Sequence, residues 1–286
     1  MVSAKHTSMT EVSVKKIGPA GIAAAEDSLV TEEPLGLRLA WMTGDGEVVH
    51  DIAVTMRTPA NDFDLALGFL FTEGFIGSVD QVAGIAWETD TKGVEQSNSL
   101  KVSLHAAPEV DPAALQRNFF VTSSCGICGK ASIDAISAQA PFPVRGESLR
   151  VSAESLNRLP EQLTAGQRIF AGTGSIHAAA LFDADGLTGD IYEDVGRHNA
   201  VDKLIGANLR AAKLPLWNFG VIVSGRASFE LVQKARMAGI PMLVAVGAPS
   251  SLAVELAWES RMTLAGFLRD GRFNVYAGPA RIVTGD

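Results

Sequence analysis

The sequence predicts a layered α/β domain preceded by a smaller α+β domain. From Val151 onward, short apolar runs of strand length alternate with amphipathic helical segments, a pattern typical of helices packed on a largely parallel sheet. Before that point, residues 31–118 contain paired strand-like runs, glycine-containing turns and one clear helix. We therefore assign residues 31–118 to the α+β domain and residues 119–286 to the α/β domain.

The small domain is expected to follow a tail without regular structure. Residues 1–30 are polar and alanine-rich, with no apolar core behind a basic start, so we expect a disordered tail and no signal peptide. Strands are expected at 35–42 and 48–56, around a Gly-Asp turn. Residues 61–73 place apolar side chains on one helical face, and Gly74 ends that helix. Further strands are expected at 82–87 and 100–105.

The α/β domain is expected to begin with a helix at 156–169, followed by a glycine loop and the apolar strand 176–182. After this strand, helices with apolar residues at helical spacing alternate with short apolar strands. In order, these segments are the helix 197–213, the strand 219–223, the helix 228–238, the strand 242–246, the helix 251–261 and the strand pair 263–267 and 273–276.

The composition is that of an ordinary soluble globular protein. The 286 residues are 47% hydrophobic and 20% charged, and no apolar run approaches the ~20 residues that span a bilayer. A net charge of −8 disfavours nucleic acid as a partner, whereas the 11 basic and 8 acidic residues of 191–286 suit a local anionic ligand. Two cysteines and no export signal predict a cytoplasmic protein that does not bind membranes.

The two cysteines lie three positions apart in the loop Ser123-Ser-Cys-Gly-Ile-Cys-Gly-Lys130. Glycines remove bulk beside each sulfur, and Lys130 favours the thiolate over the thiol. Cys125 and Cys128 are therefore predicted to be exposed and reactive. The alternatives are two buried thiols or half of a structural metal site, but buried thiols prefer apolar neighbours, which this loop lacks.

Four polar loops occupy equivalent places, beside a strand end or at the start of a helix. Such places bind anions in open α/β sheets, because helix N-termini offer unpaired backbone N–H groups, and Arg197 and Arg226 could add charged hydrogen bonds. Each loop alone is explained by ordinary loop chemistry, but together with the basic last third they favour a phosphate or nucleotide site. The loops are 172–175, 196–199, 224–226 and 247–251.

Two arginines and two histidines are further candidates. Arg269 and Arg272 bracket an Asp-Gly hairpin turn, where they could grip a pyrophosphate or purine or could equally be surface charges. His177 and His198 are candidates for a base or a ligand, although a lone histidine is more often hydrogen-bonded than catalytic. His198 is favoured because its neighbours are polar and begin a helix.

A set of short motifs is spread from Glu32 to Ile282. They are Glu33-Pro-Leu35, Met56-Arg-Thr-Pro59, Leu67-Gly-Phe-Leu-Phe-Thr-Glu-Gly74, Thr122-Ser-Ser-Cys-Gly-Ile-Cys-Gly-Lys130, Gly174-x-x-His177-x-Ala, Glu193-Asp-Val-Gly-Arg-His-Asn-Ala-Val-Asp-Lys203, Ser224-Gly-Arg226 and Gly266-Phe267. A chain with this combination resembles the formate dehydrogenase accessory sulfurtransferases, the FdhD family.

The resemblance implies a sulfur carrier protein with sulfurtransferase activity. Such proteins accept sulfur from a cysteine desulfurase as a cysteine persulfide. They pass it to the molybdenum cofactor, bis-molybdopterin guanine dinucleotide, before that cofactor enters the formate dehydrogenase catalytic subunit. The resemblance also implies a homodimer, a cytidine-deaminase-like α/β domain and no permanently bound metal. Carried over, Cys125 is the persulfide carrier, and Cys128 is a helper that receives or releases sulfur or guards the partner against over-oxidation.

The resemblance further implies which residues contact the client cofactor. The segment from Phe267 to Arg272 corresponds to the family's cofactor-contacting segment, and the polar loops supply the rest of the pocket. The expected binding residues are Phe267, Leu268, Arg269, Asp270, Gly271 and Arg272, together with Gly174, His177, Arg197, His198, Ser224 and Arg226.

Three rival functions use the same cysteines. A zinc deaminase needs H-x-E and P-C-x-x-C, but no histidine here is followed by glutamate at the second position, and Ser124 precedes Cys125. A thioredoxin-type disulfide reductase carries its pair after the first strand of a small βαβ fold, whereas this pair lies at mid-chain. A module in which the CxxC loops of two subunits share zinc would satisfy tetrahedral geometry and stays open.

Overall fold

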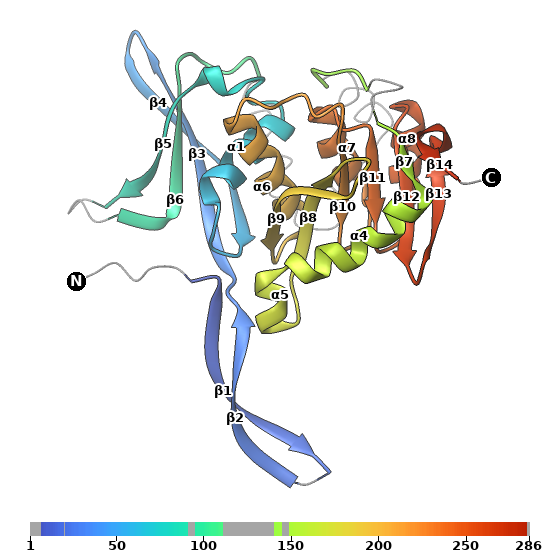
Figure 1. Ribbon diagram of the computed structural model, residues 1–286. Coiled ribbons are helices and arrows are strands. Elements are labelled where there is room, and N and C mark those ends of the chain that lie inside the picture. The colour runs from blue at the N-terminus through green and yellow to red at the C-terminus, as the bar shows by residue number, and fades with distance from the viewer. Residues whose placement is uncertain (1–6, 20, 91–94, 111–139, 145–148, 285–286) are drawn as a thin grey trace.

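The computed structural model shows a layered body from which one β-hairpin projects (Figure 1). Cys125, Cys128 and the predicted domain boundary at residue 118 lie outside the described residues. The described residues are 7–19, 21–90, 95–110, 140–144 and 149–284.

The prediction of a disordered tail over residues 1–30 is corrected by the projecting hairpin for the part of that range that the structure describes. Strands β1 (Met9–Gly18) and β2 (Gly21–Val30) pair along their whole length in antiparallel register, and we call them the arm. Most side chains of the arm are exposed, so its strands need no hydrophobic alternation. Alanine, which is common in β2, is also depleted in strands. For both reasons the sequence pattern did not reveal the arm.

The small domain is a four-stranded sheet covered by one helix. Its strands are β3 (Glu33–Thr43), β4 (Gly46–Arg57), β5 (Val82–Thr89) and β6 (Glu95–Leu104), in the order β4-β3-β6-β5. Alternate residues of β3, such as Leu35 and Leu37, are buried because successive side chains of a strand point to opposite faces. They face helix α1 (Asp62–Thr72), and a short 3₁₀ turn at Val79–Gln81 precedes β5.

A six-stranded sheet forms the centre of the second domain. Its strands are β8 (His177–Phe182), β9 (Leu187–Asp194), β10 (Gly220–Val223), β11 (Met242–Ala245), β12 (Thr263–Arg269) and β13 (Arg272–Ala277), in the order β13-β12-β11-β10-β8-β9. Only β10, β11 and β12 run parallel, so the expected largely parallel sheet is instead mixed. The outer pairs are hairpins, and a short connection can join only antiparallel strands.

Helices cover both faces of this sheet, which makes three layers. Helix α4 packs on one face, whereas α6, α7 and α8 pack on the other (Figure 1). The expected helix 156–169 is two helices, because the chain is extended at Gln167. The helices are α4 (Ala153–Gly166), α5 (Arg168–Thr173), α6 (Arg197–Arg210), α7 (Phe229–Met237) and α8 (Ser251–Glu259). A 3₁₀ turn at Pro279–Arg281 leads to β14 (Ile282–Val283), which pairs with β7 (Val151–Ser152).

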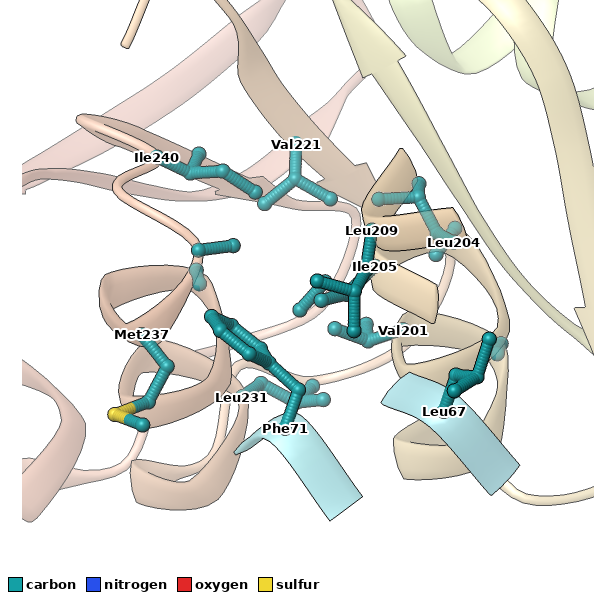
Figure 2. Packing of buried hydrophobic residues seen from close by; sticks show 14 of the residues in the cluster. Leu67, Phe71, Val201, Leu204, Ile205, Leu209, Val221, Leu231, Met237 and Ile240 are labelled. Atoms are coloured by element: carbon teal, nitrogen blue, oxygen red, sulfur yellow. The ribbon is translucent and has the colours of Figure 1, made fainter. Parts of the chain in front are cut away.

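The two domains share one core where α1 packs against α6 and α7, a contact that we call the joint. The helices approach closely at two glycines: a Cβ on Gly68 would lie 1.8 Å from the Asp202 carbonyl oxygen, and a Cβ on Gly206 would lie 1.8 Å from that of Asp64. Phe71 of α1 lies among the apolar side chains of α6 and α7 (Figure 2). The predicted domains are therefore packed as one body.

Candidate functional site

The predicted binding loops meet along one edge of the six-stranded sheet. His177 begins β8 opposite Asp194, the last residue of β9, and Ser224 follows β10 beside them. Gly247 follows β11, and Phe267 lies in β12 at the same level. Carboxyl ends of parallel strands share an edge, and β8 runs the opposite way, so its first residue joins them. We call this edge the rim.

Backbone hydrogen bonds connect the loops of the rim. The Gly247 amide donates to the Gly225 carbonyl at 2.9 Å, and the Phe267 amide donates to the Gly247 carbonyl at 3.0 Å. The Ser224 hydroxyl accepts from the Ala178 amide at 2.9 Å. A Cβ on Gly225 would lie 3.2 Å from Nδ1 of His177. Any other residue at this position would therefore push the imidazole ring of His177 aside. The rim is thus a rigid row of loops.

The start of α6 is fixed from below by a buried ion pair. The Asp194 carboxylate lies 2.6 Å from Nζ of Lys203, and both side chains are fully buried. Asp194 also accepts from the amides of Thr58 and Gly196, at 3.2 Å and 2.8 Å. The Asn199 amide group donates to Asp194 at 3.0 Å. These contacts tie the β4–α1 loop to the loop that presents Arg197 and His198.

Both rim histidines are held in the neutral form. Burial, followed by the charge of Arg197, lowers the pKa of His177. Burial, followed by the charges of Lys234 and Arg197, lowers the pKa of His198 to about 3. Nε2 of His198 lies 3.1 Å from the Ser228 hydroxyl, with which it shares a hydrogen bond, and 3.1 Å from a Glu230 carboxylate oxygen. The rim therefore presents imidazoles without charge at neutral pH.

The positive charge of the rim comes from arginines. Within the described part of the chain, Arg197, Arg226, Arg269 and Arg272 form no salt bridge. Nε of Arg197 is buried and has no hydrogen-bond partner among these residues. Guanidinium groups in this state are suited to a phosphate or carboxylate, which they bind through paired hydrogen bonds.

A shallow surface cavity of about 280 Å³ lies at the β12–β13 hairpin. The guanidinium of Arg269 lies 5.7 Å from the centre of the Phe267 ring. Phe267 and Asp270 both have φ 56°, in the left-handed region, which turns the chain sharply on either side of Arg269. The lining residues are Phe267, Arg269, Arg272, Phe273 and Asn274.

The structure separates the predicted binding residues into three groups. His177, Arg197, Ser224 and Arg226 lie along the rim, with His198 one residue inside α6, and Gly174 ends α5 in the left-handed conformation nearby. Phe267, Arg269 and Arg272 line the cavity, and Asp270 and Gly271 form its turn. Leu268 is different, because its side chain is fully buried in the core and only its backbone could reach a ligand.

The described residues that follow the cysteine loop are anchored away from the rim. Nε1 of Trp217 donates to the Pro143 carbonyl at 3.1 Å, and Phe142 packs between Phe71 and Trp217. Trp217 precedes β10, so this anchor lies at the opposite end of the sheet from Ser224. The predicted sulfur carrier Cys125 lies outside the described residues.

Sequence reasoning missed the residues that support the rim. The motif from Glu193 to Lys203 contains Asp194 as well, but the sequence predicted a role only for its Arg197 and His198. Glu193 accepts from the Ile169 and Phe170 amides at 2.9 Å and 3.0 Å and so caps α5. The available signal was Lys203 itself, because it stands among the residues that form the buried face of α6, where a lysine needs a carboxylate partner.

Comparison with known proteins identifies the family. The model of the FdhD/NarQ family matches residues 30–283. The chain belongs to this family. Its relatives include the sulfur carrier protein FdhD of Streptomyces avermitilis, which is 50% identical over 94% of both chains. The FdhD of Sulfurisphaera tokodaii is 40% identical over 95% of this chain and 98% of its own.

The fold also has a counterpart among solved structures. A crystal structure described as that of a formate dehydrogenase accessory protein from Desulfotalea psychrophila aligns with a TM-score of 0.70. The two are 23% identical, and the alignment covers 96% of this chain and 99% of the other. The two chains therefore share this mixed α/β fold, whereas the cytidine-deaminase-like layering stays a prediction.

The described part of the chain shows neither a metal-binding cluster nor a membrane-spanning helix. Among the described residues, no three His, Cys, Asp or Glu side chains gather where they could hold a metal ion. None of the helices in the described ranges is long and apolar enough to cross a membrane. The zinc-bridging alternative depends on Cys125 and Cys128 and is addressed by experiment below.

Proposed function

We propose that this FdhD protein is a cytoplasmic homodimeric sulfur carrier that serves formate dehydrogenase. The observation that carries the proposal is the family match over residues 30–283, with curated relatives named as sulfur carriers. The CxxC loop supplies a thiol for the sulfur, and the cationic rim supplies a place for an anionic client. Cys125 is the carrier, and Cys128 is its helper.

The proposed chemistry is a pair of sulfur transfers. The Cys125 thiolate attacks the outer sulfur of a persulfide on a cysteine desulfurase, forming a new S–S bond while the desulfurase cysteine leaves as a thiolate. In the delivery step this bond breaks, and its electron pair stays with Cys125. The transferred sulfur is reduced to sulfide by two electrons from the metal of the client cofactor. Lys130 favours the thiolate that begins the cycle.

The client proposed for the rim is the guanine dinucleotide form of the molybdenum cofactor. The arginines without salt bridges suit its phosphates, and the cavity at Phe267 offers an aromatic ring beside two of them. GDP represents half of one dinucleotide and is a practical probe. Binding to FdhD is measured by calorimetry at fixed ionic strength, because charge contributes strongly.

The expected result is GDP binding that depends on Arg269 and Arg272. Loss of a charged hydrogen bond costs about 1.5–3 kcal/mol, or roughly ten- to hundredfold in affinity, so Arg269→Ala with Arg272→Ala should weaken binding at least that much. Arg158→Ala is the matched control, because Arg158 is exposed on α4 and pairs with Glu154. Absence of GDP binding, or equal affinity in all three proteins, would contradict this site.

The sulfur step is tested by intact mass. Incubation with a cysteine desulfurase and cysteine should add one sulfur atom to FdhD and none to Cys125→Ala, and that variant should no longer activate formate dehydrogenase. Cys128→Ala should lose less activity, because one thiolate suffices to carry a persulfide. Equal and complete loss in both variants would favour a disulfide cycle, and zinc at half a mole per chain would favour a metal shared between subunits.

The sulfur must travel to reach the rim. Cys125 is 15 positions from both Val110 and Ala140. A fully extended chain of that length reaches about 50 Å, which is the greatest distance at which Cys125 could lie from either residue. The residues from Ala140 are anchored at the opposite end of the sheet. We therefore expect bound client cofactor to slow alkylation of Cys125 by iodoacetamide, whereas equal labelling rates with and without it would separate the thiol from the rim.

A further inference from the structure

The arm exposes apolar side chains that its own two strands cannot bury. Ile17 and Ile22 are 80% and 70% exposed, and they are direct partners in the register, so they share one face near the tip. Leu29 and Met9, at the base, are 48% and 38% exposed. An isolated two-stranded ribbon is marginal in water, so a ribbon this apolar needs a partner surface.

Charge is divided along the length of the arm. The tip half carries Lys15 and Lys16 and no acidic residue, whereas the base half carries Glu11, Glu26 and Asp27 and no basic one. All five side chains are exposed. The arm is therefore positive at its tip and negative at its base, with apolar side chains at both ends.

We propose that the arm packs antiparallel against the arm of a second copy of this chain, with the tip of each on the base of the other. A two-fold axis brings the same surface of both copies together, so a surface with opposite halves complements itself. Successive side chains of a strand point to opposite faces, so one face of the arm carries Lys15 and Ile17 at the tip and Met9, Glu11 and Glu26 at the base. Packed on this face, the antiparallel arrangement sets Lys15 against the partner's Glu26, and Ile17 beside the partner's Met9. A parallel arrangement would instead oppose like charges.

The interface extends beyond the arm. A ribbon of ten-residue strands is about 33 Å long and about 10 Å wide, and its face of roughly 330 Å² is less than the ~800 Å² per partner of a stable dimer. Of the eleven large apolar side chains exposed in the described residues, six lie on the arm or on the end of β4 next to it. Val54 and Met56, on β4 just past the base, are 75% and 46% exposed. They supply the additional apolar area.

The pairing would bring each arm tip close to the rim of its partner. The base of the arm contacts α5, and a Cβ on Gly172 would lie 2.8 Å from Sδ of Met9. The arm projects from the end of the molecule where α5 lies (Figure 1), and α5 ends at Gly174 beside the rim. The partner's Lys15 and Lys16 would thus add positive charge near the proposed anion site. This inference rests on the homodimer of the proposed function and adds how its subunits meet.

The test uses two charge-reversed full-length proteins. The tip variant carries Lys15→Glu and Lys16→Glu, so its tip and base are both negative. The base variant carries Glu26→Lys and Asp27→Lys, so its charge is reversed where the tip should dock. Like charges in contact are unfavourable, so each variant alone should dissociate at least about 30-fold more readily than the unmodified protein. Mass is measured by light scattering over a dilution series, with circular dichroism as the check on folding.

Mixing the two variants restores opposite charges at both contacts and should restore a dimer that contains one chain of each. Ile17→Asp should dissociate the dimer, whereas Met42→Asp, at a site on β3 that is 66% exposed and lies outside the proposed interface, should not. If the unmodified protein is dimeric and both charge variants remain so, the arm inference is overturned but the homodimer stands. A monomeric unmodified protein overturns both, and a mixture that stays monomeric overturns the antiparallel pairing.

Discussion

Charged side chains are paired in the joint, whereas the arginines of the rim have no partner of opposite charge among the described residues. In the joint, buried lysines and carboxylates meet at hydrogen-bond distance, as with Lys234 of α7 and Asp202 of α6 at 3.0 Å, and the same holds for Lys203 of α6 and Asp194 below the rim at 2.6 Å. Along the rim, four arginines have no acidic partner among the described residues, and the histidines are neutral. A buried charge is tolerated only when it is paired, whereas a charge at an open edge is solvated by water and stays available to a ligand.

The second buried cluster of the joint follows the same rule. Nζ of Lys234 lies 3.0 Å from carboxylate oxygens of Asp202 and Glu73, and it donates to the Thr72 hydroxyl at 2.9 Å. Burial raises the pKa of Asp202 to about 6. Burial alone would lower the pKa of Lys234, but the two carboxylates raise it. The cluster joins α1, α6 and α7 and so holds the two domains together.

Breaking the ion pair of Lys203 should have the largest effect on stability. Lys203→Met leaves the Asp194 carboxylate buried without its cation, which should lower the free energy of unfolding by about 3–5 kcal/mol in urea titrations. Lys101→Met is the control, because Lys101 pairs with Glu47 at the surface and should cost only about 0–1 kcal/mol. Equal losses of unfolding free energy in the two variants would mean that the buried ion pair stabilises the fold no more than the surface pair does.

Filling the helix contact should have the next largest effect. A methyl group at Gly68 or Gly206 meets backbone atoms of the facing helix, so each Gly→Ala change should destabilise FdhD by about 1–3 kcal/mol despite the better helix propensity of alanine. A Cβ at Gly84 meets nothing within 4 Å, which makes Gly84→Ala the matched control. Thermal unfolding that fails to separate the three variants would show that the helices can move apart at little cost.

Removing a rim arginine should change binding and leave stability almost unaltered. Arg226→Ala should weaken binding of inorganic pyrophosphate or GDP roughly ten- to hundredfold, because a charged hydrogen bond is lost. Its free energy of unfolding should change by less than about 0.5 kcal/mol, as is usual for surface substitutions. Calorimetry and urea unfolding on the same preparation test both. A large loss of stability would place Arg226 with the residues of the joint.

The smallest effect concerns His198 and pH. The folded protein holds this imidazole neutral, with its pKa lowered to about 3, whereas the unfolded chain takes up a proton near pH ~6.5. As pH falls below ~6.5, the unfolded state therefore gains protons and stability falls, by at most about 1.4 kcal/mol per pH unit. His198→Gln should flatten this part of the curve. Asp202 contributes the opposite slope but is present in both proteins, so the difference between their unfolding curves isolates His198.

Much of the body could be predicted from the sequence because its elements carry local signals. Helices at Asp62–Thr72 and Arg197–Arg210 followed from apolar residues at helical spacing. Strands such as Gly220–Val223 followed from short apolar runs between turns. The rim could be anticipated as well, because glycines and arginines follow strand ends in the chain, and strand ends of parallel segments must meet at one edge.

Other features were decided only by the tertiary structure. Whether β8 runs parallel or antiparallel to β10 depends on how the chain returns to the sheet, which no local pattern encodes. The arm has only a weak local signal, because most of its side chains are exposed and three of the ten residues of β2 are alanine. The partner of Lys203 was hidden for a different reason. Asp194 lies nine positions earlier in the same motif, but the motif also contains the carboxylates Glu193 and Asp202, and only the fold decides which of them is buried against the lysine.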